Sequence, residues 1–426
     1  MPFRNALSIG LLVVAAAVTA RDGRAQEWTR FRGPNGSGRS ETVLPAQWSE
    51  TDFEWKAPIP GEGHSSPVVW GDRVFLLSSD RATATRYALC LSARDGSTLW
   101  SNEFPSVRHT LHIRSSYASS TPTVDDERVY FAWSAPEETM LIAFFHDGRE
   151  AWKVNLGRWV SQHGYGTSPI LHGDLLIVNN SQDGNDGEKK LKPDEVPGDS
   201  FVLAFDRKTG RELWRARRAS NVVSYAVPCI RESSPGKAEV VCLSTNEGVY
   251  ALDLLTGREN WSVPKAFTMR TVSSPVLAAD HVFGTTGSGG GGNYVVAVKP
   301  GTGADIAFEV RKQAPYVPTP LPSGDSVFLW SDGGVVTCID ARSGATRFAG
   351  RAHDGDFSGS PILAGDKIYC VSDDGVLVCI AASDTELKVL GKTTLGEASR
   401  STPAVSGSRM FLRTYSHVMC VGPKSS

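Results

Sequence analysis

The sequence predicts an all-β protein, an eight-bladed β-propeller of four-stranded antiparallel blades, and three observations carry this prediction. The 426 residues include 42 Gly and 24 Pro, which separate short apolar runs as tight turns separate strands. A Ser/Thr-rich stretch that ends in Pro recurs five times, and three more prolines continue the same spacing. A segment ahead of the first repeat supplies the one strand that the last repeat lacks.

Each repeat begins at a proline, and the intervals between these prolines run from 41 to 59 residues. Periods of this size are typical of propellers, whose blades each consist of four short strands. We therefore expect one blade to begin after each of the following prolines: Pro67, Pro122, Pro169, Pro228, Pro275, Pro320, Pro361 and Pro403.

Inside the repeats, a glycine turn precedes an aromatic residue by four positions. The glycine can adopt the positive φ of a tight turn. The aromatic side chain then falls on the fourth strand, where a large flat ring can pack on the neighbouring blade. The structural docking residues predicted in this way are Trp100, Trp152, Trp214 and Trp261.

The last repeat is one strand short. After Pro403 it offers strands near Val405, at 410–414 and at 418–421, and then the chain stops. Residues 53–56 precede the first repeat and have no blade of their own. If they complete the last blade, the ring closes and leaves no long bare sheet edge. We expect the propeller over residues 53–424, preceded by an N-terminal arm over 26–52.

Residues 1–25 have the layout of a signal peptide, with an early Arg4, an apolar run and small residues at the end. We expect cleavage after Ala25, with Ala20 as the alternative, and release into the periplasm or outside the cell. This apolar run is too short to span a bilayer, and no second apolar stretch reaches that length. Removing these residues takes away three Arg and one Asp, so the formal charge changes from −2 to −4. Such mild acidity argues against a nucleic-acid partner.

The seven cysteines all lie in apolar runs, where Cys behaves as a small buried hydrophobic residue. Cys370 and Cys379 are the exception to consider, because a two-residue turn at Asp374 and Gly375 would place them opposite each other on a hairpin. One disulfide there is the alternative to seven buried thiols.

With these features the sequence resembles the PQQ-repeat propellers, a family that includes quinoprotein alcohol dehydrogenases and BamB of outer-membrane assembly. Their docking motif reads Ala-x-Asp-x-x-Thr-Gly-x-x-x-Trp, and residues 204–214 and 251–261 match it at every fixed position. The resemblance covers roughly residues 55–421. It implies the propeller fold and says little about activity, because the motif is structural.

The resemblance implies two alternative functions. Quinoprotein enzymes carry an adjacent pair of Cys, a carboxylate base and metal-binding acids, and the adjacent Cys pair is absent from this sequence. We therefore assign no cofactor and no metal from the sequence, and PQQ stays an alternative. The departures favour a BamB-like, non-catalytic scaffold that binds a protein or small ligand at its loop face, although the lipid-anchor Cys of BamB is also absent. The rival function is a PQQ-dependent oxidoreductase.

The candidate binding residues stand just before the repeat prolines, because the loops that enter each blade gather at one mouth of the channel. Three Arg and two His there could hold a carboxylate or phosphate group, and Tyr would add flat contact area. Solvated loop residues are the alternative interpretation. We expect a monomer that binds a protein partner or an anionic small ligand. The candidates are His64, Arg114, Tyr117, His163, Tyr165, Tyr225, Arg270, Tyr316, Asp356 and Arg400.

Two further motifs predict no metal or nucleotide site. His109 and His112 lie between arginines and lack a third ligand with acidic neighbours, so we expect no metal there. Residues 287–292 satisfy the dinucleotide-binding pattern, but that pattern counts only between a strand and a helix. Strands flank the segment on both sides, and we expect a flexible hairpin loop.

Two segments have open roles. The acidic cluster that begins at Asp183 and continues with Asn185, Asp186 and Glu188 fails the EF-hand spacing. We expect a solvated loop there, with a lid or partner contact as the alternative. Residues 28–36 are expected to lie across the propeller with Trp28 and Phe31 buried, and a partner-docking arm is the alternative.

Overall fold

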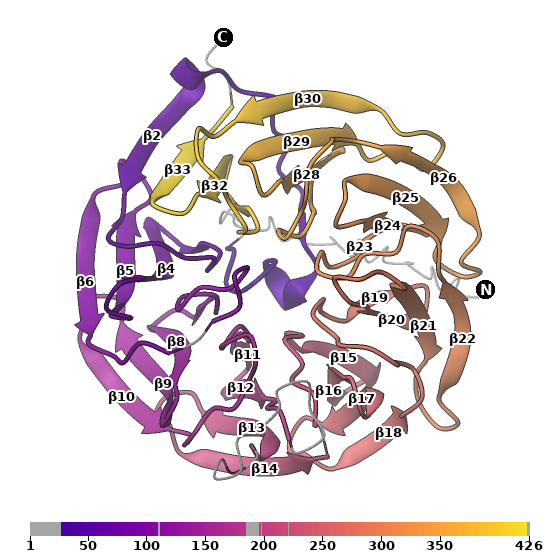
Figure 1. Ribbon diagram of the computed structural model, residues 1–426, viewed down its shortest axis with the longest axis horizontal. Helices are drawn as coiled ribbons and strands as arrows, with labels where there is room; N and C mark the ends of the chain where they lie inside the picture. The colour runs from indigo at the N-terminus through magenta and orange to yellow at the C-terminus, as the bar shows by residue number, and fades with distance from the viewer. Residues whose placement is uncertain (1–26, 110, 185–195, 197, 220, 424–426) are drawn as a thin grey trace, which may run out of the picture.

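Eight four-stranded antiparallel sheets stand side by side around a central channel and form a closed ring (Figure 1). This computed structural model describes residues 27–109, 111–184, 196, 198–219 and 221–423. The prediction of an eight-bladed propeller is confirmed. Every innermost strand begins at the residue after a repeat proline, because proline cannot donate to a sheet and fits best just ahead of the first residue pair.

The first four blades each follow chain order from the channel outward. They consist of β3 (Val68–Trp70), β4 (Arg73–Ser79), β5 (Arg86–Ser92) and β6 (Thr98–Phe104); β7 (Thr123–Val124), β8 (Arg128–Ala135), β9 (Glu138–Phe145) and β10 (Glu150–Asn155); β11 (Ile170–His172), β12 (Leu175–Asn180), β13 (Ser200–Asp206) and β14 (Glu212–Arg218); and β15 (Cys229–Ser234), β16 (Lys237–Ser244), β17 (Gly248–Asp253) and β18 (Glu259–Val263).

The remaining blades continue the pattern, and the last one takes its outermost strand from the N-terminal side of the chain. They consist of β19 (Val276–Ala278), β20 (His281–Thr286), β21 (Tyr294–Lys299) and β22 (Asp305–Val310); β23 (Leu321–Ser323), β24 (Ser326–Trp330), β25 (Val335–Asp340) and β26 (Thr346–Arg351); β27 (Ile362–Ala364), β28 (Lys367–Val371), β29 (Val376–Ala381) and β30 (Val389–Thr394); and β31 (Ala404–Ser406), β32 (Arg409–Arg413), β33 (His417–Val421) and β2 (Phe53–Pro58).

Strand β2 closes the ring, as the sequence predicts. It pairs antiparallel with β33, and Figure 1 shows the indigo and yellow ends of the chain side by side. Trp55 on β2 packs on Gly96 of blade 1, so close that a Cβ there would lie 2.6 Å from the indole. Its indole Nε1 donates a hydrogen bond to the carbonyl oxygen of Ala93 at 3.2 Å. The seam between blades 8 and 1 is therefore built from the same two kinds of contact as three other blade boundaries.

The docking tryptophans follow this pattern in three of the four predicted positions. The indole Nε1 atoms of Trp100, Trp152 and Trp214 each donate to a backbone carbonyl of the next blade at 2.9 to 3.0 Å. Their rings also pack on the turn glycine of that blade. Trp261 differs, because its indole donates to the buried carboxylate of Glu239 in its own blade at 3.0 Å. A repeat that matches the motif at every position therefore still departs from the docking contact.

The N-terminal arm crosses the end of the channel opposite the loop face. Trp28 is fully buried and pairs with Val69 of β3 through two backbone hydrogen bonds. Further on, β1 (Arg39–Ser40) pairs parallel with β27 of blade 7. Between them lies the short 3₁₀ helix η1 (Pro34–Gly36), which Figure 1 shows at the centre of the ring. A second 3₁₀ helix, η2 (Glu50–Asp52), leads into β2.

Two buried arginines of the arm hold it to the inner strands. Arg30 donates to the carbonyl oxygen of Pro228 at 2.7 Å, and Arg32 donates to those of Pro320 and Pro361 at 3.1 and 3.2 Å. Neither ion has a carboxylate partner among the described residues, and burial lowers the pKa of Arg32 to about 9. The guanidinium groups thus satisfy backbone carbonyls next to the innermost strands, where the arm contributes only the two-residue strand β1.

The seven cysteines are buried and unpaired, and the disulfide alternative is wrong. Cys370 stands opposite Val378, and Cys379 stands opposite Tyr369, so the two thiols are one register position apart. Since neighbouring strand residues point to opposite faces of a sheet, this single step sends the two side chains to different sides of the blade.

Two predicted segments lie wholly or partly outside the residues that the structure describes. The signal peptide over residues 1–25 lies outside the described residues. So do Asn185, Asp186 and Glu188 of the acidic cluster, whereas Asp183 is fully buried. In the described part of the chain, no helix is both long and apolar enough to cross a membrane.

Candidate functional site

A series of hydroxyl groups ties the blades together around the channel. The backbone N–H of the residue before one repeat proline donates to the side-chain hydroxyl of the equivalent residue in the next blade, at 2.9 to 3.1 Å. The series is interrupted only at Val227, which has no hydroxyl. It explains the Ser/Thr bias of the repeat, and we call it the hydroxyl series. Its members are Ser66, Thr121, Ser168, Ser274, Thr319, Ser360 and Thr402.

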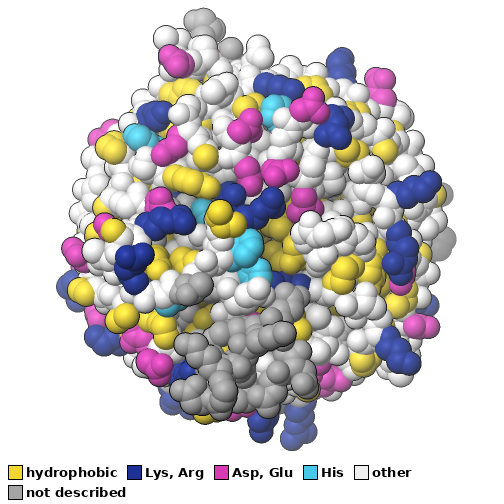
Figure 2. Space-filling model, viewed as in Figure 1, with side chains coloured by type: hydrophobic (Ala, Val, Ile, Leu, Met, Phe, Trp, Pro, Cys, Tyr) yellow, Lys and Arg dark blue, Asp and Glu magenta, His cyan; other side chains and the backbone are white. Residues whose placement is uncertain are grey.

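Above the hydroxyl series the channel widens into a cavity of about 820 Å³ that opens on the loop face. The arm closes the other end, and Phe31 of the arm is part of the cavity lining. Three valines, Val227, Val272 and Val317, also line it. The hydroxyl series lines the cavity as well, so the cavity is a blind funnel whose lower part combines apolar side chains with hydroxyl groups. Figure 2 shows histidine side chains near the middle of this face, among basic and acidic ones.

The structure brings most of the predicted binding residues to this one cavity. All of the ten except Tyr117 and Tyr165 line it. The hydroxyl of Tyr117 donates to the carbonyl oxygen of His109 at 2.6 Å, so it holds the loop between β6 and β7 in place. Tyr165 is buried against Trp159, and burial raises the pKa of its phenol. These two tyrosines support the loops rather than face the funnel.

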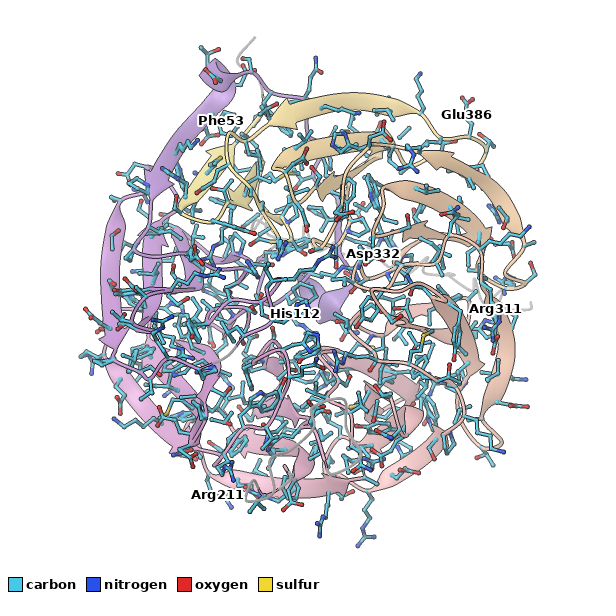
Figure 3. All side chains as sticks on the ribbon, in the orientation of Figure 1. Phe53, His112, Arg211, Arg311, Asp332 and Glu386 are labelled. Atoms are coloured by element: carbon cyan, nitrogen blue, oxygen red, sulfur yellow. The ribbon has the colours of Figure 1, made fainter. Side chains whose placement is uncertain are left out.

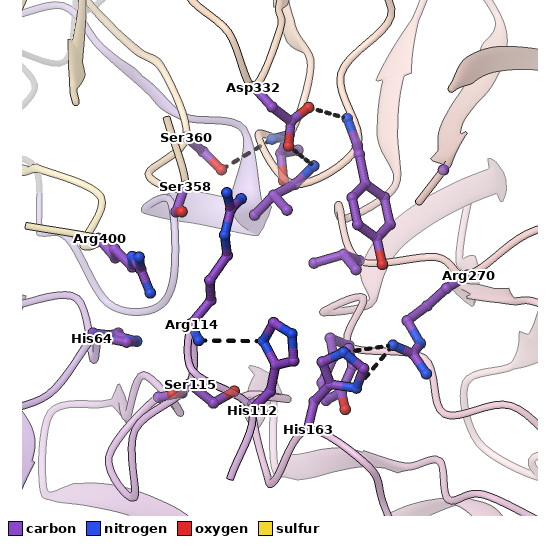
Figure 4. A pocket seen from close by; sticks show the side chains of 18 of the residues that line it. His64, His112, Arg114, Ser115, His163, Arg270, Asp332, Ser358, Ser360 and Arg400 are labelled. Atoms are coloured by element: carbon purple, nitrogen blue, oxygen red, sulfur yellow. Dashed lines mark hydrogen bonds between the residues drawn. The ribbon is translucent and has the colours of Figure 1, made fainter. Parts of the chain in front are cut away.

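Arg114 reaches from the β6–β7 loop across the mouth to the opposite loops. Its Nη2 lies 3.3 Å from Oδ2 of Asp356, which belongs to the loop between β26 and β27. Both side chains are more than half exposed, at 52% and 60%. Figure 4 shows the Arg114 side chain pointing toward Asp332 and Ser358. Exposed pairs of this kind contribute about 0–1 kcal/mol, so this contact can be exchanged for another at little cost.

Arg400 is held by one side of its guanidinium group. Its Nε donates to Oδ2 of Asp373 at 3.1 Å, and the hydroxyl of Ser358 donates to the same oxygen at 3.0 Å. No hydrogen bond joins either Nη atom of Arg400 to a described residue, and Arg400 lines the cavity. The terminal donors of this arginine therefore remain available inside the funnel.

Three histidines line the funnel, and their surroundings keep them neutral. His163 lies beside Arg270, with its ring nitrogens 2.9 and 3.0 Å from Nη1, and its ring is 4.5 Å from that of His112. Burial, together with Arg270 and His112, lowers the pKa of His163 to about 3. Burial and nearby arginines also lower the pKa of His64 to about 3 and that of His112 below its usual value. At neutral pH these imidazoles accept or donate hydrogen bonds without adding charge.

Asp332 is a cavity residue that the sequence reasoning missed. Its two carboxylate oxygens accept hydrogen bonds from the backbone N–H groups of Tyr316 and Val317, at 2.6 and 3.1 Å (Figure 4). Burial raises the pKa of this carboxyl group, and the nearby charge of Arg114 acts in the opposite direction. Asp332 follows β24 in a hairpin loop, whereas the predicted site residues all belong to the loops that enter a blade. Figure 3 labels Asp332 and His112 close to the channel axis.

The remaining motifs have mixed outcomes. His109 contacts Val107 and Tyr117, whereas His112 stacks on His163, so these two histidines do not converge on one point. Within the described ranges, no three His, Cys, Asp or Glu side chains are grouped to hold a metal ion. Residues 287–292 form the β20–β21 hairpin loop at the cavity, as predicted.

A PQQ-repeat family model described as "Outer membrane protein assembly factor BamB" matches residues 39–137 and 88–349, which is well over half of the chain. The chain belongs to this family. No curated protein sequence matches this BamB-family propeller significantly.

Solved structures resemble this BamB-family propeller at low sequence identity. BamB from Moraxella catarrhalis is 15% identical, with a TM-score of 0.59 over 87% of this chain and 97% of that one. Sqt1 from Saccharomyces cerevisiae is 9% identical, with a TM-score of 0.60 over 88% and 99%. The quinohemoprotein alcohol dehydrogenase from Comamonas testosteroni is 12% identical, with a TM-score of 0.52 over 94% and 81%. At such identities the likeness shows the fold alone.

Proposed function

We propose that this protein is an exported, non-catalytic propeller that binds a small ligand in the funnel at its loop face. The observation that carries the proposal is the shape of the channel, which the N-terminal arm closes at one end while the loops leave it open at the other. A volume of about 820 Å³ falls within the range of about 300–1,000 Å³ that is typical of small-molecule sites. A lining that combines apolar side chains with a few polar groups is also typical of such sites.

The polar groups of the funnel support binding rather than chemistry. Asp356 faces an arginine, and Asp332 uses both carboxylate oxygens to accept backbone N–H groups. A general base must instead be within hydrogen-bond reach of the proton that it removes and able to accept it. These carboxylates are already engaged in the structure, so they fit the recognition of a ligand better than the transfer of a proton.

A PQQ-dependent oxidoreductase is the alternative function, and the residues present do not fit that cofactor. The family resemblance links the cofactor to adjacent cysteines and metal-binding acids. All seven cysteines lie inside the blades, and none of them lines the funnel. The engaged carboxylates described above offer no cluster of oxygen ligands. We therefore derive no reaction step through a quinone.

Export is the second part of the proposal, and it rests on the signal-peptide layout of residues 1–25. Expression of the full chain in a bacterial host, followed by N-terminal sequencing of the protein from the periplasm or medium, tests it. We expect a mature N-terminus at Gln26, or at Arg21 for the alternative cleavage site. An intact N-terminus on protein that stays in the cytoplasm would contradict this part of the proposal.

Ligand binding can be tested by equilibrium dialysis of the purified protein against culture medium, followed by mass spectrometry of the retained small molecules. The informative variant is Gly289→Trp. Gly289 lines the funnel, and a Cβ there meets no atom within 4 Å, so the new side chain blocks the mouth without disturbing the blades. Its matched control is Glu386→Trp, at an exposed outer position that Figure 3 labels far from the axis.

We expect at least one compound to be retained by the wild type and by Glu386→Trp, and lost from Gly289→Trp. Equal retention by all three proteins would overturn the funnel as the binding site. A parallel sample with PQQ and calcium tests the alternative function, since PQQ-dependent dye reduction with alcohols or sugars would replace the proposal by the oxidoreductase.

A further inference from the structure

The charged groups of the funnel are divided between two sides. Asp332 and Asp356 come from the loops of blades 6 and 7, and both line the cavity. Arg400, which precedes blade 8, lines it as well, and so do the neutral His64 and His112. Arg270, which precedes blade 5, also lines the cavity, next to the neutral His163. The cluster that the sequence predicts as cationic is therefore a site of mixed charge, with an acidic side at blades 6 and 7, Arg270 on one flank of it and Arg400, the basic side, on the other.

On the acidic side, Arg114 occupies the position where a ligand's cation would bind. The pair of Arg114 and Asp356 spans 242 sequence positions and joins two loops over the mouth. Its long separation of 3.3 Å and its exposure make it weak. An ammonium group that enters the funnel can replace the guanidinium group there and leave the carboxylates with an equivalent partner. Arg114 is then displaced into water, where it is well solvated.

On the basic side, Arg400 presents a guanidinium fork with a fixed direction. Asp373 and Ser358 anchor the base of the group through Nε, as described above. The two Nη atoms, which have no hydrogen bond to a described residue, are the donors that bind a carboxylate in a bidentate manner. His64 and His112 nearby are neutral and add polarity without attracting a second anion.

We propose that the funnel binds a zwitterion of the amino-acid or short-peptide class, with its ammonium group at Asp356 and Asp332 and its carboxylate at Arg400. An apolar side chain of the ligand lies toward Phe31 and the valines that line the lower part. This inference rests on the proposed function and specifies its ligand. A ligand with one positive and one negative charge suits this site, because Asp356 can exchange its arginine for an ammonium group and Arg400 can bind a carboxylate. A simple anion would instead lie close to the negative charges of Asp356 and Asp332.

Four forms of one dipeptide test both contacts in a single set of calorimetric titrations: Ala-Phe with free ends, the N-acetylated form, the C-amidated form and the doubly blocked form. We expect the free form to bind most tightly. Each block should weaken binding about tenfold, because it removes one charge-assisted hydrogen bond. The doubly blocked form should be the weakest.

Variants of the protein assign each contact. In Asp356→Asn, acetylation of the ligand should weaken binding less than in the wild type, because only Asp332 remains to hold the ammonium group, while amidation weakens binding as before. In Arg400→Gln the reverse is expected, and Arg400→Lys should recover part of the lost affinity because it keeps the charge. Arg114→Gln should tighten the binding of free-amino peptides only, since it removes their competitor. Asp72→Asn is the matched control, because it breaks an exposed pair with Arg94 on the opposite face of the ring.

Three results would overturn the inference: equal binding of free and acetylated peptides, equal binding of free and amidated peptides, or no binding of any form at millimolar concentration. The dialysis experiment separates these failures from failure of the proposed function. If Gly289→Trp still abolishes retention of a natural compound while the peptides fail, the funnel binds a ligand of another class and only this inference falls.

Discussion

The two ends of the channel both contain arginines, and they use them in opposite ways. At the closed end Arg32 is fully buried and donates to backbone carbonyls, and it cannot leave without exposing them. At the open end Arg114 is half exposed and faces a carboxylate that another cation could serve equally well. Burial and the type of partner, rather than the residue type, therefore separate a structural arginine from one available to a ligand.

The largest expected effect comes from breaking the closed end. Arg32→Ala leaves the carbonyl oxygens of Gly36, Pro320 and Pro361 without their donor. Because a buried acceptor without a partner costs about 1–3 kcal/mol, we expect the unfolding free energy to fall by about 3 kcal/mol in a urea titration. A change as small as that of a surface substitution would show that the arm does not hold the ring together.

A smaller loss of stability is expected at the hydroxyl series, which lies between the open and the closed end of the channel. Thr402→Val removes the acceptor of the Ser360 N–H with almost no change in shape. The expected loss is about 1–2 kcal/mol, measured in the same titration. The matched control is Val227→Thr, which supplies the one missing hydroxyl and should not destabilise the protein. Equal losses in both variants would mean that side-chain packing, not the hydrogen bond, sets the effect.

The open end should respond to pH. The imidazole of His163 takes up a proton near pH 6.5 when the chain is unfolded, but only at about pH 3 in the folded protein. Between these values the unfolded chain binds more protons, so the unfolding free energy falls as the pH decreases. This contribution is lost at up to about 1.4 kcal/mol per pH unit. In His163→Gln the decline between pH 6.5 and 4 should be shallower, and parallel curves for the two proteins would contradict the burial of a neutral imidazole.

The smallest effect on stability is expected at Arg114. Arg114→Ala breaks only an exposed pair, so the unfolding free energy should change by less than about 1 kcal/mol. The contrast with Arg32→Ala is the direct test of the comparison, since both substitutions remove one arginine from the same channel. A loss as large as that of Arg32→Ala would mean that the mouth is as rigid as the closed end.

The sequence predicts the blades well because each blade is a local pattern. Pro67 and its seven equivalents mark the first strands, and 53–56 is recognisable as the missing strand by its position alone. The mouth residues are also found, because they stand at a fixed place before those prolines. Asp332 was missed because it belongs to a different loop of the blade, although an acidic residue two positions after β24 is a signal that could have found it.

The pairing of charges could not be predicted. Arg114 and Asp356 lie 242 positions apart, and nothing local shows that their loops meet over the channel. Residue types alone suggested a cationic site, and only the three-dimensional arrangement reveals its acidic side. The contact of Trp261 could not be predicted from its motif either. Its partner Glu239 lies on another strand of the same blade, and the indole donates to that carboxylate and not to the next blade.

The arm also links ligand binding to the order of folding. Residues 28–40 come first in the ring's sequence, yet Arg30 bonds 198 positions ahead, and Arg32 bonds 288 and 329 positions ahead. Such distant contacts form late in folding, because the entropy cost of closing a long loop must be met before the contact can stabilise the chain. The floor of the funnel is thus completed only when blades 6 and 7 exist. A nascent or truncated chain would leave the channel open at both ends. Under the proposed function, the retention of a ligand would therefore report that the ring is whole.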